Sequence, residues 1–473
     1  MRVFTYPAEK YDELNISKQD IRKLIQKHIA LAARLEKNMK YYEGIQAILD
    51  RQKEEGAPNN CLVCNHAKDI SDTASSYFIG EPISYKSDAD ISILTDAFET
   101  AGADEVDGDN GLDLSIYGLA YEYIYAKEDE TDLTIKNLPP TNTFMVYDDT
   151  IEQKELFAVY YYVKKDDTDK IADRYVATVL TENYKYVLNI LNSEGTQVLT
   201  EEPEPHYMGE IPVIEYQNNK LGIGDFELQI PLIDAYNAIM SDRVNDKEQF
   251  IDSILAIYGV LLSDEDYEVD EENTGDGKGS EKAMRELRRK KLLELPGEGA
   301  KAEYLTHTFD EAGVEVLRKA IEQDIHKFSH IPCLTDDAFG GNVSGVAMEF
   351  KLLGMENITK IKTRYYKKGI RKRIRMFSVW MSIKGKNVDI NGIKPVFTRC
   401  MPKNLLEISQ WVGNLWGKVS RKTLLSQIPF VDNVDEELAA VEKEEEANVK
   451  RQQQIFRGEQ NTPLVEDDAD GEA

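Results

Sequence analysis

Cys61, Cys64 and His66 are the residues whose spacing comes nearest to a metal-binding motif. A Cys-x-x-Cys pair with a histidine close by offers the thiolate and imidazole ligands that Zn²⁺ prefers. No second pair of such ligands follows nearby, and the other two of the four cysteines, Cys333 and Cys400, lie far along the chain. Because this segment also has a helical pattern, we interpret the thiols as packing residues.

Three loop-like segments have partial features of ligand-binding motifs. Gly222-Ile-Gly224 lacks the third glycine of a dinucleotide loop, and residues 275–282 (GDGKGSEK) lack the spacing of a phosphate loop. Residues 270–281 follow the frame of a calcium-binding EF-hand, but glutamate and threonine occupy its third and fifth positions. None of these segments predicts a bound cofactor.

Acidic pairs such as Asp336-Asp337 would suit a metal-dependent nuclease. The chain has 86 Asp and Glu residues, so such pairs are expected by chance, and its 6 histidines are scattered. No Ser/His/Asp or Cys/His arrangement is present in the sequence pattern. We therefore predict no catalytic residue, no metal ligand and no cofactor, and keep the nuclease as the enzymatic alternative.

Composition limits the class of protein. With 473 residues, 41% hydrophobic and 30% charged, the chain predicts two to four domains with real cores. Its net charge of −29 would repel phosphate, so bulk nucleic-acid binding is disfavoured. The longest uncharged apolar stretch, 253–263, is too short for a membrane span, and no signal peptide is evident. We expect a soluble intracellular product with reduced thiols.

The residue pattern of the N-terminal half changes once, from helical to strand-like. Helices are predicted from the capping box Ser17-x-x-Asp20, over 62–78, and as two acidic helices within 89–118. Over 121–216, short segments rich in Tyr, Val and Ile alternate with polar turns. This alternation predicts antiparallel strands.

The middle of the chain predicts long helices. Amphipathic helices over 231–258 and 309–330 flank a polar insert, 259–308, which contains short strands, an acidic run and a short basic helix. A glycine-containing loop, 335–344, leads to a helix over 345–383. Its second half carries nine Lys and Arg residues, which we interpret as a solvated face whose aliphatic stems lie along the surface.

The C-terminal part predicts a hairpin with Asn391-Gly392 as its turn. Helices over 405–417, 421–427 and 433–457 follow. The acidic tail, 458–473, is predicted to be disordered.

Four stretches in this order resemble the portal proteins of tailed bacteriophages, of the kind found in siphophages of Gram-positive hosts. They are YYEGIQAILDRQ (41–52) with the following 59–85, GIGDFELQIPLIDAYNAIMSDRVND (222–246), SGVAMEFKLLGMEN (344–357) and SRKTLLSQIPFVDNVDEELAAVEKE (420–444). The order of elements, two long helices around a small polar insert and then a loop and a very long helix, is similar as well.

The resemblance implies an α+β, mainly helical portal fold that assembles into a ring of about twelve copies around a channel. Its parts would be a wing (1–230), a first stem helix (231–258), a clip (259–308), a second stem helix (309–331), a tunnel loop (332–344), a long wing helix with a hairpin (345–403), a crown (404–457) and the acidic tail (458–473).

The same resemblance implies three sets of functional residues. The tunnel loop would place Thr335, Asp336, Asp337, Ala338, Phe339, Gly340, Gly341 and Asn342 at the narrowest point of the channel. The second stem helix would line the channel with Lys319, Gln323, His326 and Lys327, on the face opposite its apolar stripe of Val314, Leu317, Ile321, Ile325 and Phe328. The clip would bind a partner through Asp264, Glu265, Asp266, Arg285, Arg288, Arg289 and Lys290.

The implied function is structural rather than enzymatic. The ring would sit at one capsid vertex of the virion after assembly in the host cytoplasm, and would serve genome packaging, head–tail joining and DNA ejection. Its partners would be double-stranded DNA without sequence specificity, the terminase, scaffolding and major capsid proteins, and a head-completion or adaptor protein, with no membrane. A metal-dependent nuclease or another DNA-packaging enzyme remains the alternative, and a sequence-specific DNA binder is disfavoured because no basic recognition helix is evident.

Overall fold

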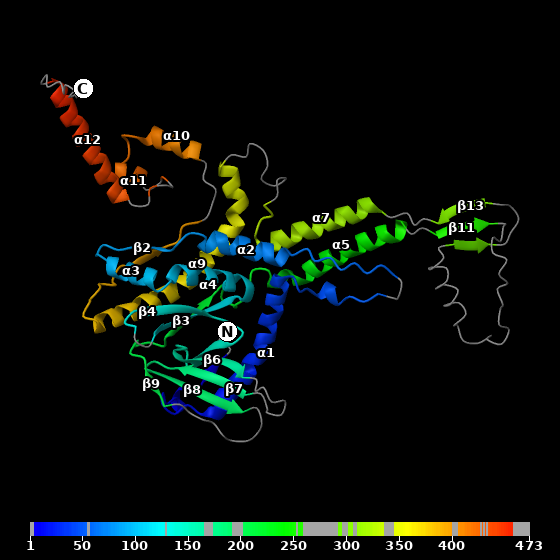
Figure 1. The fold of residues 1–473 in the computed structure, drawn as a ribbon, viewed down its shortest axis with the longest axis horizontal. Coiled ribbons are helices and arrows are strands. Elements are labelled where there is room, and N and C mark those ends of the chain that lie inside the picture. Colours follow the sequence, from blue (N-terminus) through cyan, green and yellow to red (C-terminus); the bar gives the residue numbers. More distant parts are fainter. Residues whose placement is uncertain are drawn as a thin grey trace, which may run out of the picture. The chain divides into compact units, whose positions relative to one another are not determined.

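The computed structural model describes residues 4–53, 57–127, 130–164, 174–191, 202–251, 254–258, 292–295, 301–305, 310–334, 345–399, 405–425, 428, 431 and 434–456. Within them the chain is a mixed α+β protein that divides into two compact units, residues 1–400 and 401–473. Figure 1 shows that the first unit combines sheets, long helices and a two-helix hairpin, and that the second is helical.

Two antiparallel sheets form from the region predicted to be strands. Their strands are β1 (Thr5–Tyr6), β3 (Leu119–Ala126), β4 (Leu133–Leu138), β5 (Thr143–Asp148), β6 (Glu155–Lys164), β7 (Arg174–Leu180), β8 (Tyr184–Leu191), β9 (Glu204–Pro205) and β10 (Val213–Gln217). One sheet has the order β1-β5-β6-β7-β8-β9, with only β1 running parallel to its neighbour, and the other has the order β10-β3-β4. Tyr121, Met145 and Val213 belong to the apolar core between them.

The first helix, α1 (Lys18–Glu43), covers the six-stranded sheet. Ile21 and Ile25 are buried in a core with residues of β5 to β8. Ser17 is the N-cap, as predicted, but its side chain makes no capping hydrogen bond. The capping box is therefore wrong in detail, although the start of the helix is confirmed. Three further residues lead to the short 3₁₀ segment η2 (Ala47–Asp50).

Helix α2 (His66–Ile79) begins four residues later than predicted. The Asn65 side chain accepts a hydrogen bond from the Lys68 N–H and caps the helix. Residues 59–65 are extended instead of helical. Their backbone donors are used by another helix, as described below, and that long-range pairing overrides the local helical pattern.

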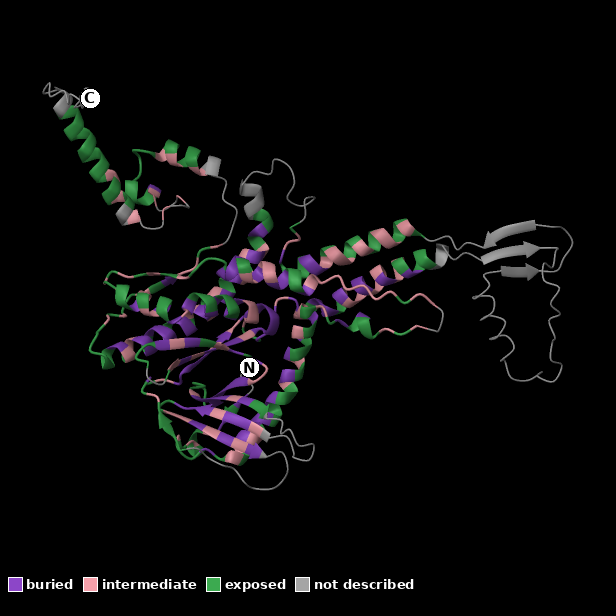
Figure 2. Cartoon of the chain, viewed as in Figure 1, coloured by how far each residue is buried: buried purple, intermediate pink, exposed green. Residues whose placement is uncertain are grey.

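A second core joins the three-stranded sheet to four helices. These are α2, α3 (Ser92–Thr100), α4 (Ala103–Tyr117) and the 39-residue α9 (Gly345–Ile383), whose bounds agree with the prediction. Phe98 and Phe377 meet edge to face with ring centroids 4.8 Å apart, and many of their neighbours are fully buried. Figure 2 shows this buried zone in purple along α4, α9 and the strands between them.

Arg373 of α9 lies at the centre of this core, fully buried. Its guanidinium donates to the carboxylates of Asp107 in α4 and Glu122 in β3. The hydroxyls of Tyr366 and Tyr216 donate to the same two carboxylates. Every charge in this group has an opposite charge and a further donor beside it, which is the condition for burying ions without a large net cost.

The helix predicted over 231–258 is shorter than expected. Helix α5 spans Ile230–Ile251, and residues 254–258 form strand β11 (Ile254–Tyr258). This strand pairs with β12 (Leu292–Leu295) and β13 (Lys301–Leu305), the two strands predicted in the insert. The sequence ILAIY contains β-branched and aromatic residues, and pairing on both sides favours the strand.

The hairpin predicted around Asn391-Gly392 is also wrong in part. Gly392 has φ +82°, as a turn requires, but the strand after it, β14 (Lys394–Val396), pairs with β2 (Ser84–Lys86). The three predicted C-terminal helices are confirmed as α10 (Leu405–Leu415), α11 (Arg421–Leu425) and α12 (Val434–Phe456). Ser420 caps α11 by accepting from the Thr423 N–H, as predicted.

Gly369 generates a stability prediction. A Cβ at this position in α9 would lie 2.2 Å from the Tyr216 ring, which stacks on Tyr366. We expect Gly369→Ala to lower the free energy of unfolding by about 1–3 kcal/mol, because the Arg373 cluster must shift. Gly108→Ala is the matched control: it also lies inside a helix but has open space around it, and should stabilise the chain by about 0.5–1 kcal/mol. Equal effects in denaturant titrations would contradict the packing argument.

Candidate functional site

Two long helices form a hairpin that projects from the first unit. Helix α5 lies beside α7 (Glu311–Ser329), which ends before Pro332 as predicted (Figure 1). Arg243 of α5 forms ion pairs with Glu311 and Glu315 of α7. Hydrogen bonds from Arg318 and Arg243 lower the pKa of Glu315 to about 2, so these pairs persist across the physiological pH range.

One face of α5 binds the chain's own extended segment. The side chains of Asn245, Ser241 and Asn237 accept hydrogen bonds from the backbone N–H groups of Asn60, Leu62 and Cys64 at 2.7, 2.9 and 2.8 Å. Four residues of a helix advance about 6 Å, and two residues of an extended chain advance about 6.6 Å. The two periods match, so three donors meet three acceptors in register. We call this arrangement the polar ladder.

A second contact fixes the start of the same segment. Arg51 and Lys53 lie 2.5 and 3.1 Å from the carboxylate of Asp242. Partial burial opposes ionisation of Asp242, but hydrogen bonds from these two cations lower its pKa overall. Asn237, Ser241 and Asn245 are buried beneath the extended segment.

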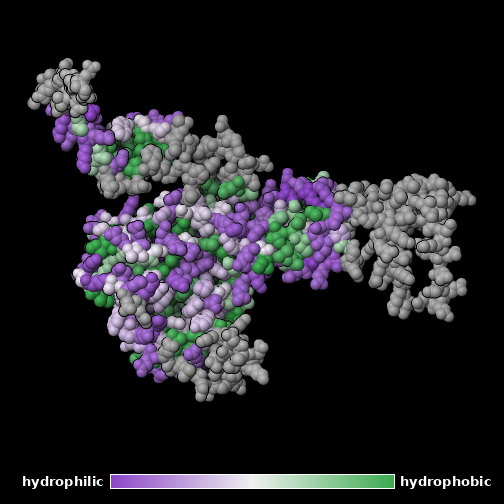
Figure 3. All heavy atoms as spheres, in the orientation of Figure 1, coloured by the Kyte–Doolittle hydropathy of each residue, from purple (hydrophilic) through white to green (hydrophobic). Residues whose placement is uncertain are grey.

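Helix α7 leaves apolar side chains uncovered. The predicted buried stripe is confirmed at Ile325, which is inaccessible to solvent. It is wrong at Leu317 and Phe328, which are 52% and 55% exposed. Val316, on the face of α7 that carries Lys319, is 70% exposed. Figure 3 shows a hydrophobic patch on the hairpin between hydrophilic edges. Exposed apolar groups gathered on one element are typical of a surface that a partner covers.

The four residues predicted to line a channel separate into two groups. Lys319, Gln323 and Lys327 are exposed on α7. His326 is buried, its Nδ1 lies 3.1 Å from the Ile331 carbonyl oxygen, and its ring centroid lies 5.5 Å from that of His66. Burial and the neighbouring His326 lower the pKa of His66. His326 therefore belongs to the base of the hairpin rather than to its solvent face.

The other two predicted sets cannot be compared with the structure. The residues expected in the tunnel loop (Thr335, Asp336, Asp337, Ala338, Phe339, Gly340, Gly341 and Asn342) lie outside the described residues. So do those expected in the clip (Asp264, Glu265, Asp266, Arg285, Arg288, Arg289 and Lys290) and the EF-hand-like segment 270–281.

The described part of the chain contains no metal-ligand cluster, and the phosphate-loop-like segment 275–282 lies outside the described residues. No three His, Cys, Asp or Glu side chains there are arranged to hold a metal ion, and Cys61, Cys64 and Cys333 are not in disulfide bonds. Gly224 makes a tight turn, since a Cβ there would lie 2.4 Å from the Ile116 carbonyl oxygen. Among the described helices, none combines the length and the apolar character that crossing a bilayer requires.

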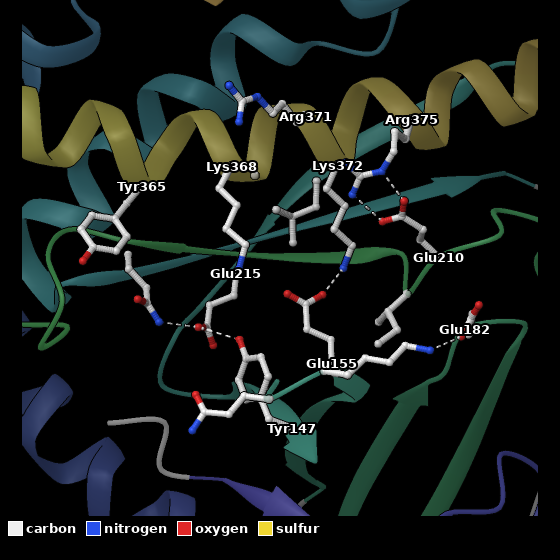
Figure 4. Close-up of a pocket in the computed structure, with 16 residues that line it drawn as sticks. Tyr147, Glu155, Glu182, Glu210, Glu215, Tyr365, Lys368, Arg371, Lys372 and Arg375 are labelled. Atoms are coloured by element: carbon white, nitrogen blue, oxygen red, sulfur yellow. Dashed lines mark hydrogen bonds and ion pairs between the residues drawn. The ribbon is translucent and has the colours of Figure 1, made fainter. Parts of the chain in front are cut away.

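A groove with a volume of about 560 Å³ lies where α9 passes the two sheets. Figure 4 shows Lys368 extending into it from α9 toward Glu215, and Lys372 pairing with Glu155 at 2.6 Å. Tyr147 donates to Glu215 at 2.9 Å. The groove is thus lined by alternating cationic and anionic groups.

The basic run of α9 is only partly solvated, contrary to the prediction. Lys362 is buried and pairs with Asp225 at 2.8 Å, and Lys372 and Arg373 are buried as well. Their acidic partners come from segments more than 130 residues away, which is why helical periodicity could not identify them. The exposed members, Arg364 and Lys368 among them, lie on another face of the helix.

Comparisons with known proteins agree with this architecture. A family model described as "Phage portal protein, SPP1 Gp6-like" matches residues 21–451. The chain is 25% identical to the portal protein of Bacillus phage SPP1 over 423 residues, which cover 84% of this chain and 78% of that protein. It is 24% identical to the portal protein of Clostridium phage phiCD119 over 337 residues, which cover 66% of this chain and 67% of that protein.

The polar ladder yields a local prediction. Ser241→Ala removes the acceptor of the Leu62 N–H, so exchange of that amide with solvent deuterium should accelerate about tenfold. Ser75→Ala is the control, because the Ser75 hydroxyl binds only backbone carbonyls of its own helix. Hydrogen-exchange mass spectrometry measures both. An unchanged rate at Leu62 in the Ser241 variant would show that the ladder does not hold this segment.

Proposed function

The chain belongs to the phage portal protein family of the SPP1 Gp6-like type, and from that membership we propose that about twelve copies form a ring around a DNA channel. The observation that carries the ring is the uncovered apolar side of α7 at Leu317 and Phe328. In a cyclic assembly one face of each subunit meets a different face of the next, so a single apolar patch per chain is covered in every copy.

The channel would be lined by the exposed cations of α7. Lys319, Gln323 and Lys327 recur along about 12 Å of helix, and ring symmetry would turn each into a circle of identical groups. The chain's net charge of −29 supports a channel that repels phosphate overall and contacts it only locally. His326 is left out of this proposal because it is buried.

The remaining parts take the roles implied by the family. Residues 332–344 would form the tunnel loop at the constriction, and 259–308 the clip that docks the terminase motor and later a head-completion or adaptor protein. Residues 1–230 and 345–403 would form the wing, and 404–457 the crown. The ring would sit at one capsid vertex, contact scaffolding and major capsid proteins, and serve packaging, head–tail joining and ejection without catalysing a reaction.

Ring formation is tested by burying charge in the proposed contact. We expect Leu317→Glu with Phe328→Glu to raise the subunit concentration needed for assembly at least about tenfold, because two desolvated carboxylates cost more than the apolar contact gains. Both positions are more than half exposed in the single chain, so the fold should persist. Sedimentation velocity and electron microscopy measure the rings. Ile151→Glu, at a fully exposed loop position, is the control.

Two outcomes of that experiment would contradict the proposal. A wild-type chain that sediments as a 53.9 kDa monomer at every concentration would exclude the ring. Rings that tolerate both glutamates at the wild-type concentration would show that another surface makes the contact.

The channel is tested by reversing the charge of two exposed lysines. Lys319→Glu with Lys327→Glu should leave rings intact but reduce the DNA packaged per particle severalfold, because in each copy two positive charges facing phosphate become two negative ones. Raising the salt concentration should restore packaging in part, since added ions screen repulsion beyond about 10 Å. The control reverses Lys10 and Lys86, which are exposed elsewhere. Full packaging at low salt would place these lysines away from the DNA.

A further inference from the structure

A stripe of cations follows the outer face of α9. Arg364, Lys368, Arg371 and Arg375 recur at intervals of four, three and four residues, all exposed, over about 16 Å of helix. We call these four residues the basic stripe. Arg375 pairs with Glu210, whereas the other three have no acidic group within ion-pair distance among the described residues. On a chain of net charge −29, such a stripe is a local exception that needs an anionic partner.

A complementary acidic feature lies on α4. Glu105 and Asp109 are exposed, one helical turn apart, and neither has a cation within ion-pair distance in the part of the chain that the structure describes. We call this pair the acidic ridge. Partial burial, and to a smaller extent the like charge of Glu105, raise the pKa of Asp109. A basic partner would relieve that repulsion.

The stripe and the ridge face opposite ways. The side chains of Asp107 and Asn110 point from α4 toward α9 and bond to its residues. Because successive helix residues are 100° apart, Glu105 and Asp109 lie on the far side of α4. The side chains of Arg373 and Tyr366 point from α9 toward the buried core that it shares with α4. The helical period of 100° per residue therefore places the basic stripe on the far side of α9. One subunit therefore carries opposite charges on opposite sides of a single helical layer.

We propose that the basic stripe of one subunit binds the acidic ridge of the next copy of this chain, as a wing contact between ring neighbours. The proposal rests on the ring proposed above. Opposite faces are the ones that a head-to-tail ring brings together, and charge complementarity across them fixes orientation and register. The groove that Lys368, Arg371 and Arg375 themselves line favours this occupant over a nucleic acid. Its wall carries Glu155, Glu210 and Glu215, which would repel a continuous phosphate backbone but leave room for two separate carboxylates beside Lys368 and Arg371.

The test is a charge swap in the full-length chain. The stripe variant is Lys368→Glu with Arg371→Glu, and the ridge variant is Glu105→Lys with Asp109→Lys. Each should raise the subunit concentration for half assembly about tenfold at low salt, and the chain carrying all four changes should return to within about threefold of wild type. The ridge variant replaces two like charges by two others at the same spacing, so repulsion within α4 is unchanged in sign.

The control is Lys10→Glu with Lys86→Glu, which changes the net charge as much as the stripe variant does. Thermal unfolding of each chain checks the fold. Normal assembly of either reversal variant, or no recovery in the fourfold variant, overturns the contact. Loss of DNA binding by the stripe variant with unchanged assembly overturns it in favour of a nucleic-acid role. If the wild-type chain stays monomeric at every concentration, both the ring and this contact are overturned. If the wild-type chain forms rings and the charge-reversal variants do so equally well, only the contact is overturned.

Discussion

The buried guanidinium of Arg373 is the constraint on which the first unit depends. It lies between Asp107 of α4 and Glu122 of β3, and the hydroxyls of Tyr366 and Tyr216 complete the hydrogen bonds of those carboxylates. Removing one partner from such a group leaves a buried charge uncompensated and typically costs about 3–5 kcal/mol. A hydrophobic core alone would tolerate a shift of α9 along the sheet. A fixed set of ions and donors does not, so the cluster defines the register of the helix.

That register also decides which charges of α9 reach solvent. With Arg373 turned inward, Lys362 and Lys372 pair with Asp225 and Glu155 at the margins of the core. The stripe that begins at Arg364 is then left on the opposite side of the same helix. One basic run thus serves two purposes that its sequence does not separate. Part of it neutralises buried acids of the first unit, and part of it forms an external surface.

Sequence periodicity was sufficient to predict the elements that pack through apolar residues. It was insufficient where polar partners from distant parts of the chain determine the local structure. The bounds of α9 and α7 follow from their apolar spacing, and so does the antiparallel region that starts at β3. Residues 62–65 of the extended segment were predicted as helix, because the acceptors of this segment on α5 lie more than 170 residues away. The inward position of His326 was missed for the same reason, since its neighbour His66 comes from α2. Strand 254–258 was assigned to the preceding helix because its pairing partners follow an insert of more than thirty residues.

In the helical hairpin, the polar face of α5 is covered by the chain itself, while apolar residues of α7 stay exposed. The polar ladder covers Asn237, Ser241 and Asn245 of α5 with the chain's own backbone, and the ion pairs of Arg243 hold α7 against α5. After those contacts are made, the acceptors of the polar ladder on α5 are hydrogen-bonded, whereas Leu317 and Phe328 of α7 remain exposed to solvent. Ordering an interface on association costs free energy. Because the polar ladder already orders the hairpin in the single chain, little further ordering is needed when subunits associate. An apolar face on a rigid support therefore favours a defined subunit contact over indiscriminate aggregation.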